Sequence, residues 1–353
     1  MIRIGVIGCG HWGPNHVRNF GRLPGVEMAA VADLDIARLA AMRYIQPSLR
    51  LETDAKAIIG SGDIDAVVIA TPTSTHYPLA RAALASGKHV LCEKPLCLHQ
   101  TEARELDATA RSQGLILMVG YTFLFNAGIA ALNKLIAQDD LGKVYYLSAV
   151  RTNLGPIRSD VNAIYDLATH DIAIFNWLLK GIPRRVQAAG GSFIQKGIED
   201  VVTICLEYPH GVFGTIHVSW LNPRKVRQMS VVGALRMATW DDLEMNTPIA
   251  IFDRGANSAP EVRDYGESLR VTMWDGDVRL PKIQLEEPLK VQARYFAEGI
   301  AKGHIAAANG DFSIGVMRAV EAAAESLRTG LPIELKNDQV TPRLPAYQPE
   351  SLP

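Results

Sequence analysis

The sequence predicts an α/β protein of two domains: a doubly wound parallel sheet, then an α+β unit with a large, mostly antiparallel sheet. The chain has 353 residues, which suits two domains better than one. Up to residue 123, short apolar strands alternate with helical patterns, as in a parallel sheet covered by helices. From residue 143 to 240, strand-like segments alternate apolar and polar residues. We expect domains over 1–123 and 124–336, and an irregular, proline-rich tail over 337–353.

A glycine-rich turn directly follows the first predicted strand, over 2–7. The first glycine of such a turn allows tight bending, the second admits a pyrophosphate, and the third lets the next helix pack against the strand. The predicted helix after it would offer free N–H groups to that pyrophosphate. The alternative is a glycine-rich turn with no ligand. The cofactor-binding candidates here are Gly8, Gly10, His11, Trp12 and Gly13.

Asp33 ends the second predicted strand, 20 residues after Gly13. A carboxylate at that spacing accepts hydrogen bonds from the ribose hydroxyls of a dinucleotide and repels a 2′-phosphate. We therefore expect NAD rather than NADP. Arg38 is the residue that argues for NADP, because an arginine there is able to reach a phosphate. The alternative for Asp33 is a helix cap, a role that Asp35 fits equally well.

Two more segments leave the predicted parallel sheet at its carboxyl edge, where open α/β sheets bind their ligands. A strand over 65–70 leads into Thr71-Pro72-Thr73-Ser74-Thr75-His76, and a strand over 88–92 leads into Glu93-Lys94-Pro95. A lone lysine before a proline is otherwise an ordinary solvated charge. The further cofactor-binding candidates are Thr71, Pro72, Thr73, His76, Glu93 and Lys94.

A predicted helix over 161–180 carries Asp166 and His170, four residues apart and so on one face. A carboxylate beside an imidazole orients the ring and stabilises its charged form, which a base taking a proton from a hydroxyl requires. The alternative is an ordinary surface pair. Asp171 points about 100° away and is the poorer partner. Further helices are expected over 125–139, 288–302 and 312–329, and a flexible loop over 255–260.

Four motifs together resemble the glucose–fructose oxidoreductase, inositol dehydrogenase and rhizopine-catabolism (Gfo/Idh/MocA) family. They are Gly8-Cys9-Gly10-His11-Trp12-Gly13, Ala70-Thr71-Pro72-Thr73-Ser74-Thr75-His76, Cys92-Glu93-Lys94-Pro95 and Asp166-Leu167-Ala168-Thr169-His170. The resemblance implies an N-terminal Rossmann domain and a C-terminal domain with a large, open, mostly antiparallel sheet. It also implies hydride transfer between a sugar or cyclitol carbon and NAD(P), and a homodimer or homotetramer formed through that sheet.

The resemblance implies three catalytic residues, Lys94, Asp166 and His170. In one assignment His170 takes the proton of a secondary alcohol and Lys94 steadies the charge on its oxygen; in the other, Lys94 takes the proton. Segments 151–171 and 219–227 look like UDP-N-acetylglucosamine (or its uronic acid) 3-dehydrogenases of bacterial polysaccharide biosynthesis. The alternatives are a free sugar or inositol dehydrogenase, and a non-catalytic dinucleotide-binding regulator. The candidate substrate residues are Asn153, Arg158, Tyr165 and Lys225; a basic loop over 219–227 is alternatively solvated or a subunit contact.

Composition narrows the class of partner. The net charge of −1 gives no support for a nucleic-acid or membrane-surface partner. The four cysteines are too few and too dispersed for a disulfide framework. No apolar run reaches the length of a membrane span, and the scattered histidines suggest no metal site. We expect a cytoplasmic protein with a small-molecule substrate.

Overall fold

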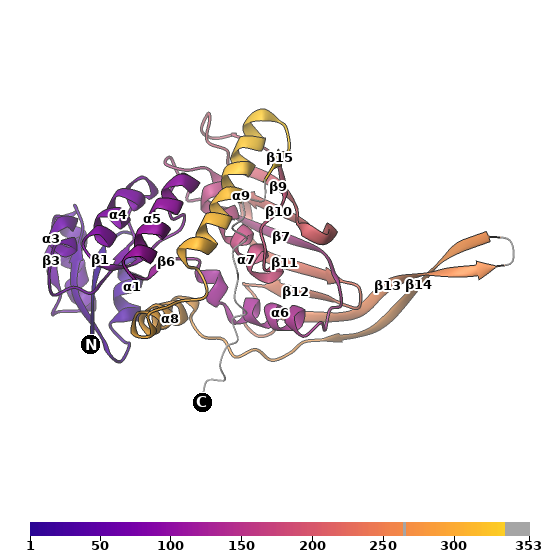
Figure 1. Cartoon of the computed structure of the whole chain (residues 1–353), viewed down its shortest axis with the longest axis horizontal. Coiled ribbons are helices and arrows are strands. Elements are labelled where there is room, and N and C mark those ends of the chain that lie inside the picture. Colours follow the sequence, from indigo (N-terminus) through magenta and orange to yellow (C-terminus); the bar gives the residue numbers. More distant parts are fainter. Residues whose placement is uncertain (264–265, 336–353) are drawn as a thin grey trace.

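The computed structural model describes residues 1–263 and 266–335, with no side-chain description for 257–272. The predicted tail over 337–353 lies outside the described residues. Two sheets lie beside each other, and the C-terminal helices span both (Figure 1). The N-terminal part of the chain builds one sheet, and the segment from residue 144 to 279 builds most of the other.

The first sheet has six parallel strands in the order β3-β2-β1-β4-β5-β6. The chain enters the sheet at the central strand β1 and adds β2 and β3 on one side. It then adds β4, β5 and β6 on the other side of β1, so the carboxyl ends of β1 and β4 flank a topological switch point. Ligands bind at that point in folds of this class. The strands are β1 (Ile2–Ile7), β2 (Val26–Ala32), β3 (Arg50–Glu52), β4 (Ala66–Ile69), β5 (His89–Cys92) and β6 (Leu117–Val119).

Helices cover both faces of this sheet, as the alternating pattern predicts. The Asp35 side chain accepts the backbone N–H groups of Ala37 and Arg38, so Asp35 rather than Asp33 caps α2. The sequence analysis had not predicted β3, α2 or α3. The helices are α1 (Gly13–Phe20), α2 (Ile36–Ile45), α3 (Ala55–Ile59), α4 (His76–Ala85) and α5 (Gln100–Ser112), with a short η1 turn at Thr73–Thr75.

The second sheet has nine strands in the order β14-β13-β12-β11-β7-β10-β9-β8-β15. Among the described strands only β7 and β10 pair in parallel, which confirms the mostly antiparallel sheet. The strands are β7 (Val144–Leu154), β8 (Arg185–Gly191), β9 (Val201–Glu207), β10 (Phe213–Ser219), β11 (Leu221–Gly233), β12 (Met237–Asp241), β13 (Ile249–Arg263), β14 (Gly266–Arg279) and β15 (Ile333–Glu334).

Two predicted loops are wrong. The loop expected over 255–260 belongs to β13, which pairs along its length with β14 in a hairpin that projects from the body (Figure 1). The basic loop expected over 219–227 spans the end of β10 and the start of β11. The pairing register of β11 with β7 shifts between Leu221 and Val226. Glycine and proline in the first segment, and proline with charged residues in the second, resemble a loop, but pairing with another strand decides the backbone conformation.

The last helices join the two domains. Helix α9 (Gly310–Thr329) packs against α5 of the first domain and β8 of the second, and α8 (Pro288–Lys302) packs against α1. The Val119 N–H donates to the Ala308 carbonyl oxygen at 2.8 Å. The second-domain helices are α6 (Ala127–Ala137) and α7 (Thr169–Leu179), with short η2 (Thr122–Phe125), η3 (Ile164–Ala168) and η4 (Pro209–Gly211). None of the helices in the described ranges is long and apolar enough to cross a membrane.

Candidate active site

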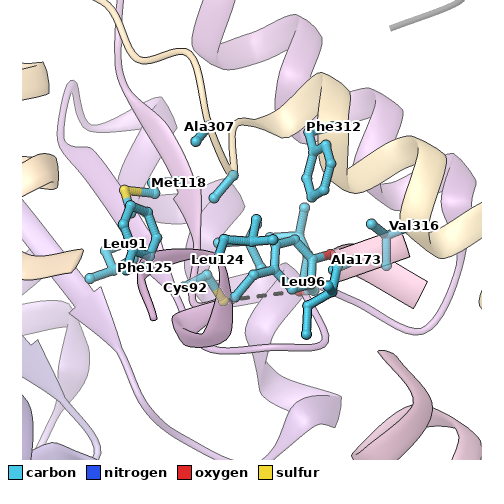
Figure 2. Packing of buried hydrophobic residues seen from close by; sticks show 14 of the residues in the cluster. Leu91, Cys92, Leu96, Met118, Leu124, Phe125, Ala173, Ala307, Phe312 and Val316 are labelled. Atoms are coloured by element: carbon cyan, nitrogen blue, oxygen red, sulfur yellow. Dashed lines mark hydrogen bonds between the residues drawn. The ribbon is translucent and has the colours of Figure 1, made fainter. Parts of the chain in front are cut away.

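The turn that carries Lys94 is anchored on both sides by the shared core of the two domains (Figure 2). Cys92 before it and Leu96 after it are fully buried. Around them Figure 2 shows Phe312 from α9 and Ala173 from α7, so both domains contribute to the packing. The Lys94–Pro95 peptide bond is cis. Close packing of this kind leaves the turn little freedom to move, and it holds Lys94 where the domains meet.

Lys94 reaches across to Asp166 on η3 of the second domain. Its Nζ donates to the Asp166 backbone oxygen at 2.7 Å and to Oδ1 at 3.1 Å. The Lys94 side chain is 9% exposed and the Asp166 side chain 16%. Asp166 Oδ1 also accepts from Arg158 at 3.2 Å, and Oδ2 accepts from the Trp220 indole N–H at 3.1 Å. Both carboxylate oxygens therefore have partners, and the lysine amine is fixed by two of its three donors.

Opposing effects act on the Asp166 carboxyl. Burial tends to raise its pKa, but the positive charges of Lys94 and Arg158, with hydrogen bonds from Lys94 and Trp220, outweigh burial and lower the pKa below the ordinary value. The carboxylate is accordingly ionised at neutral pH. It is the counter-ion of Lys94.

His170 stands at the start of α7, beside Lys94. Its pKa is lowered well below 6.5, mainly by burial. The positive charges of Lys94, Arg151 and Arg227 lower the pKa further. Its Nδ1 is buried and has no hydrogen-bond partner in the described part of the chain, although the side chain as a whole is partly exposed. The edge of its ring meets Phe123, with ring centroids 4.9 Å apart. The ring is therefore neutral at neutral pH.

The predicted pairing of Asp166 with His170 is not what the structure shows. Within the described ranges no hydrogen bond joins them, because Lys94, Arg158 and Trp220 occupy the Asp166 carboxylate. The predicted single helix is also divided, since 164–168 forms the wider π-helical turn η3 before α7 begins. The structure thus links Asp166 to Lys94.

Two ion pairs near His170, one buried and one partly exposed, were not predicted from the sequence. Arg151 on β7 binds both oxygens of Asp171 at 2.8 Å, and Arg227 on β11 donates to Asp242 at 3.1 Å. The guanidinium carbons of Arg151 and Arg227 lie 4.3 and 5.4 Å from the centre of the Phe123 ring. Asp171 neutralises the buried Arg151. The two residues of each pair lie on separate elements, so no local sequence motif predicts the pairing.

The glycine-rich turn has the shape that a dinucleotide needs. A Cβ at Gly13 would lie 2.0 Å from the Gly8 carbonyl oxygen, and a Cβ at Gly8 would lie 2.5 Å from the Ala70 oxygen, so both positions require glycine. A Cβ at Gly10 would have only Arg38 within 4 Å, at 3.7 Å. None of the described side chains caps the N-terminus of α1, where His11 and Trp12 lead into the helix. The turn therefore fits a pyrophosphate.

Asp33 lies beside this turn. One of its carboxylate oxygens accepts the Cys9 N–H at 2.6 Å and the other accepts the Asp35 N–H at 2.8 Å. The segment Thr71, Pro72 and Thr73 leaves β4 at the same edge of the sheet. The buried His76 ring lies 2.7 Å from the Pro95 oxygen and 2.9 Å from the Thr71 oxygen, so this segment touches the Lys94 turn.

The four predicted substrate residues fall in different places. Arg158 contacts Asp166 and thus lies in the same cluster as Lys94. Tyr165 precedes Asp166 on η3, and burial raises the pKa of its phenol to about 12. Asn153 near the end of β7 donates to the Gly155 oxygen. Lys225 on β11 is exposed, and none of the described residues forms an ion pair with it. Trp220, which donates to Asp166, lies in the 219–227 segment and was not predicted as a site residue.

Two family models match the chain. Residues 2–121 match an oxidoreductase family with an NAD-binding Rossmann fold, and residues 129–238 match the GFO/IDH/MocA C-terminal domain. The chain belongs to the Gfo/Idh/MocA family. It is an NAD-dependent oxidoreductase acting on CH–OH groups.

Similar proteins include curated enzymes and a solved structure. Inositol 2-dehydrogenase 2 of Paenarthrobacter aurescens is 33% identical over 62% of this chain and 68% of that protein. UDP-N-acetylglucosamine 3-dehydrogenase of Acidithiobacillus ferrooxidans is 30% identical over 74% of this chain and 80% of that protein. The crystal structure of GenD2 from gentamicin A biosynthesis, in complex with NAD, aligns with a TM-score of 0.80 at 24% identity, covering 95% of this chain and 96% of that one.

The position of Asp33 gives a testable cofactor preference in this Gfo/Idh/MocA chain. We expect Asp33→Ser to weaken NAD binding and to strengthen NADP binding, because the substitution removes the acceptor for the ribose hydroxyls and the charge that repels a 2′-phosphate. Calorimetric titration with each dinucleotide measures the ratio. Asp54→Ser, which makes the same change at the N-cap of α3, is the matched control and should leave the ratio unchanged. An unchanged ratio in Asp33→Ser would contradict the ribose-binding role.

Proposed function

We propose that this chain oxidises a secondary hydroxyl of a sugar, with Lys94, His170 and Asp166 as its catalytic residues. The observation that carries the proposal is the Lys94 amine, fixed by Asp166 beside a neutral histidine at the ligand-binding edge of the NAD domain. Bound NAD supplies the hydride acceptor. The protein supplies orientation, charge and a group to receive the proton.

Each residue has a separate task. Lys94 donates a hydrogen bond to the hydroxyl oxygen and stabilises the negative charge that develops on it. His170 takes the hydroxyl proton, since a lowered pKa keeps its ring neutral at neutral pH. Asp166 holds the Lys94 amine in place. The glycine-rich turn and Asp33 hold the dinucleotide, with Thr71, Pro72, Thr73 and His76 beside the nicotinamide half.

We further propose that the sugar is a UDP-N-acetylhexosamine, or its uronic acid, oxidised at C3 in bacterial polysaccharide biosynthesis. The similarity to the UDP-N-acetylglucosamine 3-dehydrogenase supports this. So do Arg224 and Lys225, which are exposed on β11 and have no ion-pair partner in the part of the chain described. Two such cations suit a diphosphate.

NADH formation with a panel of substrates tests the substrate class. The panel holds UDP-N-acetylglucosamine, its uronic acid, myo-inositol and glucose. We expect turnover of a UDP-sugar, and a KM for it raised about tenfold or more in the double variant Arg224→Ala/Lys225→Ala, since each lost phosphate contact costs on the order of 1 kcal/mol. Lys196→Ala, an exposed cation elsewhere in the domain, is the control. Turnover of free sugars alone would overturn the nucleotide-sugar assignment.

The second candidate is a dehydrogenase of a free sugar or inositol. The identity of 33% to an inositol 2-dehydrogenase favours it. This candidate uses the same catalytic residues and differs only in having no diphosphate to bind. Turnover of myo-inositol, unaffected by the Arg224→Ala/Lys225→Ala substitution, would select it.

A non-catalytic regulator is the candidate from another class. Such a protein would have no need of a lysine amine fixed beside a neutral histidine, and this chain has both. Tight NAD binding without turnover of any sugar in a broadened panel would favour the regulator.

We propose a cytoplasmic homodimer or homotetramer that assembles through the second sheet. One face of the sheet is buried and the other is exposed at strand β9. The buried face holds Val202, Ile204 and Leu206, and Thr203 lies on the exposed face. Light scattering coupled to size-exclusion chromatography measures the mass of the particle, and a monomeric mass would contradict the assembly.

A further inference from the structure

A buried histidine and a buried glutamate connect the cofactor-binding helix to the catalytic lysine. His16 lies on α1, directly after the glycine-rich turn, and is fully buried. Its Nε2 lies 2.8 Å from Glu93 Oε1, and the two side chains are only 1% and 8% exposed. Ionisable groups so deeply buried are retained only when they are paired. Glu93 immediately precedes Lys94, so the pair joins two parts of the site that are 77 residues apart.

The second oxygen of Glu93 faces the backbone of Lys94. Glu93 Oε2 accepts the Lys94 N–H at 3.3 Å. The carboxylate also lies against Gly120, where a Cβ would stand 3.0 Å from Oε2. With His16 on one oxygen, the Lys94 amide on the other and Gly120 against it, the carboxylate is enclosed by protein. This arrangement does not match the cofactor contact expected for Glu93 from the sequence.

A second histidine secures the same turn from its other side. The His76 ring at the start of α4 lies within hydrogen-bonding distance of the carbonyl oxygens of Pro95 and Thr71. The residues on both sides of Lys94 are therefore attached to elements that follow β1 and β4. These are the two strands whose carboxyl ends flank the dinucleotide site.

We propose that Glu93, supported by His16, is a positioning residue that aligns Lys94 with the dinucleotide held at the start of α1. The inference rests on the proposed catalytic role of Lys94. A shift of about 1 Å in a catalytic group costs on the order of 10²-fold in rate. The chain prevents such a shift by joining the catalytic turn to the pyrophosphate-binding helix through the buried contact between His16 and Glu93.

The first test measures the mobility of Lys94 without using a substrate. Trace labelling with acetic anhydride, followed by mass spectrometry, gives the acylation rates of Lys94 and Lys88 in the full chain. Lys88 is the internal reference, because its amine is bonded to the Ser61 and Ile64 oxygens in the same domain. We expect Glu93→Gln and His16→Asn each to raise the Lys94 rate several-fold with the Lys88 rate unchanged. Glu105→Gln, an exposed carboxylate bound to Tyr77 and Arg81, is the control and should change neither rate.

The pattern of labelling decides the inference. An unchanged Lys94 rate in Glu93→Gln overturns it, and so does an equal rise at Lys88, which would mean that the whole domain has loosened. Glu93→Gln has the same shape as the native residue and carries the test by itself if His16→Asn does not fold.

The second test separates positioning from cofactor binding. With a sugar that the substrate panel identifies, we expect Glu93→Gln to lower kcat about tenfold while the KM for NAD changes little. A rise in the KM for NAD with kcat unchanged would make Glu93 a cofactor ligand and overturn the inference. Failure of the proposed function is distinguishable, because it would appear as full activity in Lys94→Ala and would leave the labelling result intact.

Discussion

Replacing Lys94 by alanine should lower kcat by about 10²- to 10³-fold and leave NAD binding nearly unchanged. The size follows from the loss of one fixed donor to a developing oxyanion, which costs about 2.7 to 4 kcal/mol in comparable sites. The amine is fixed before substrate arrives, since Asp166 holds it through two hydrogen bonds of 2.7 and 3.1 Å. Steady-state NADH formation measures kcat, and calorimetry measures NAD binding.

The contact between Lys94 and Asp166 predicts a second effect of this substitution, on thermal stability. Alanine leaves the buried Asp166 carboxylate with only Arg158 and Trp220 as partners, so a small loss of thermal stability should accompany the loss of rate. Lys94→Arg is the matched variant: it keeps the charge but not the geometry, and it should restore stability more than activity. A Lys94→Ala enzyme with more than about a tenth of native kcat would contradict the oxyanion role.

Replacing His170 by asparagine should lower kcat by about 10²- to 10⁴-fold, the usual contribution of a general base. Asparagine keeps a polar group of similar size at the edge of Phe123 but accepts no proton near neutral pH. The same steady-state measurement applies, with calorimetry to show that NAD still binds. A loss of NAD binding equal to the loss of rate would assign His170 to cofactor binding instead.

The pH profile of the native enzyme should report His170. A base works in its deprotonated form, and the pKa of His170 lies well below 6.5, so kcat/KM should hold constant through neutral pH and decline only below that value. Arg227→Gln removes one of the charges that lower this pKa, so the decline should move to higher pH. Arg184→Gln, an exposed arginine on the far part of the domain, should leave the profile unchanged. A decline above pH 6.5 in the native enzyme would contradict the assignment.

Much of the chain could be predicted because the signals are local. The β1 and β2 strands and helix α8 occupy the predicted residues, since the apolar period and the flanking glycines and prolines act within a few residues. The need for glycine at position 13 is equally local, because a Cβ there would meet the Gly8 carbonyl oxygen within the turn itself. Lys94 at the carboxyl edge follows from the strand before it and the parallel order of the sheet.

The partners of these residues could not be predicted. Asp166 binds Lys94, 72 residues away, rather than the histidine four residues on, and Glu93 binds His16 across 77 residues. Arg151 binds Asp171 because the fold of the second domain brings β7 and α7 together. A local pattern specifies which face of an element is apolar, but the meeting of two charged groups depends on how whole elements pack.

The sequence by itself thus determined the two kinds of sheet and the dinucleotide turn, and it predicted Lys94, Asp166 and His170 as catalytic residues. The tertiary structure alone decided that Asp166 is the counter-ion of Lys94, that cations lower the pKa of His170, and that Glu93 is enclosed by His16 and Gly120. The physical reason is that the energy of an electrostatic interaction, and the pKa of each group, depend on the neighbouring charges and on the exclusion of water. Both are set only when the two domains close on the turn that carries Lys94.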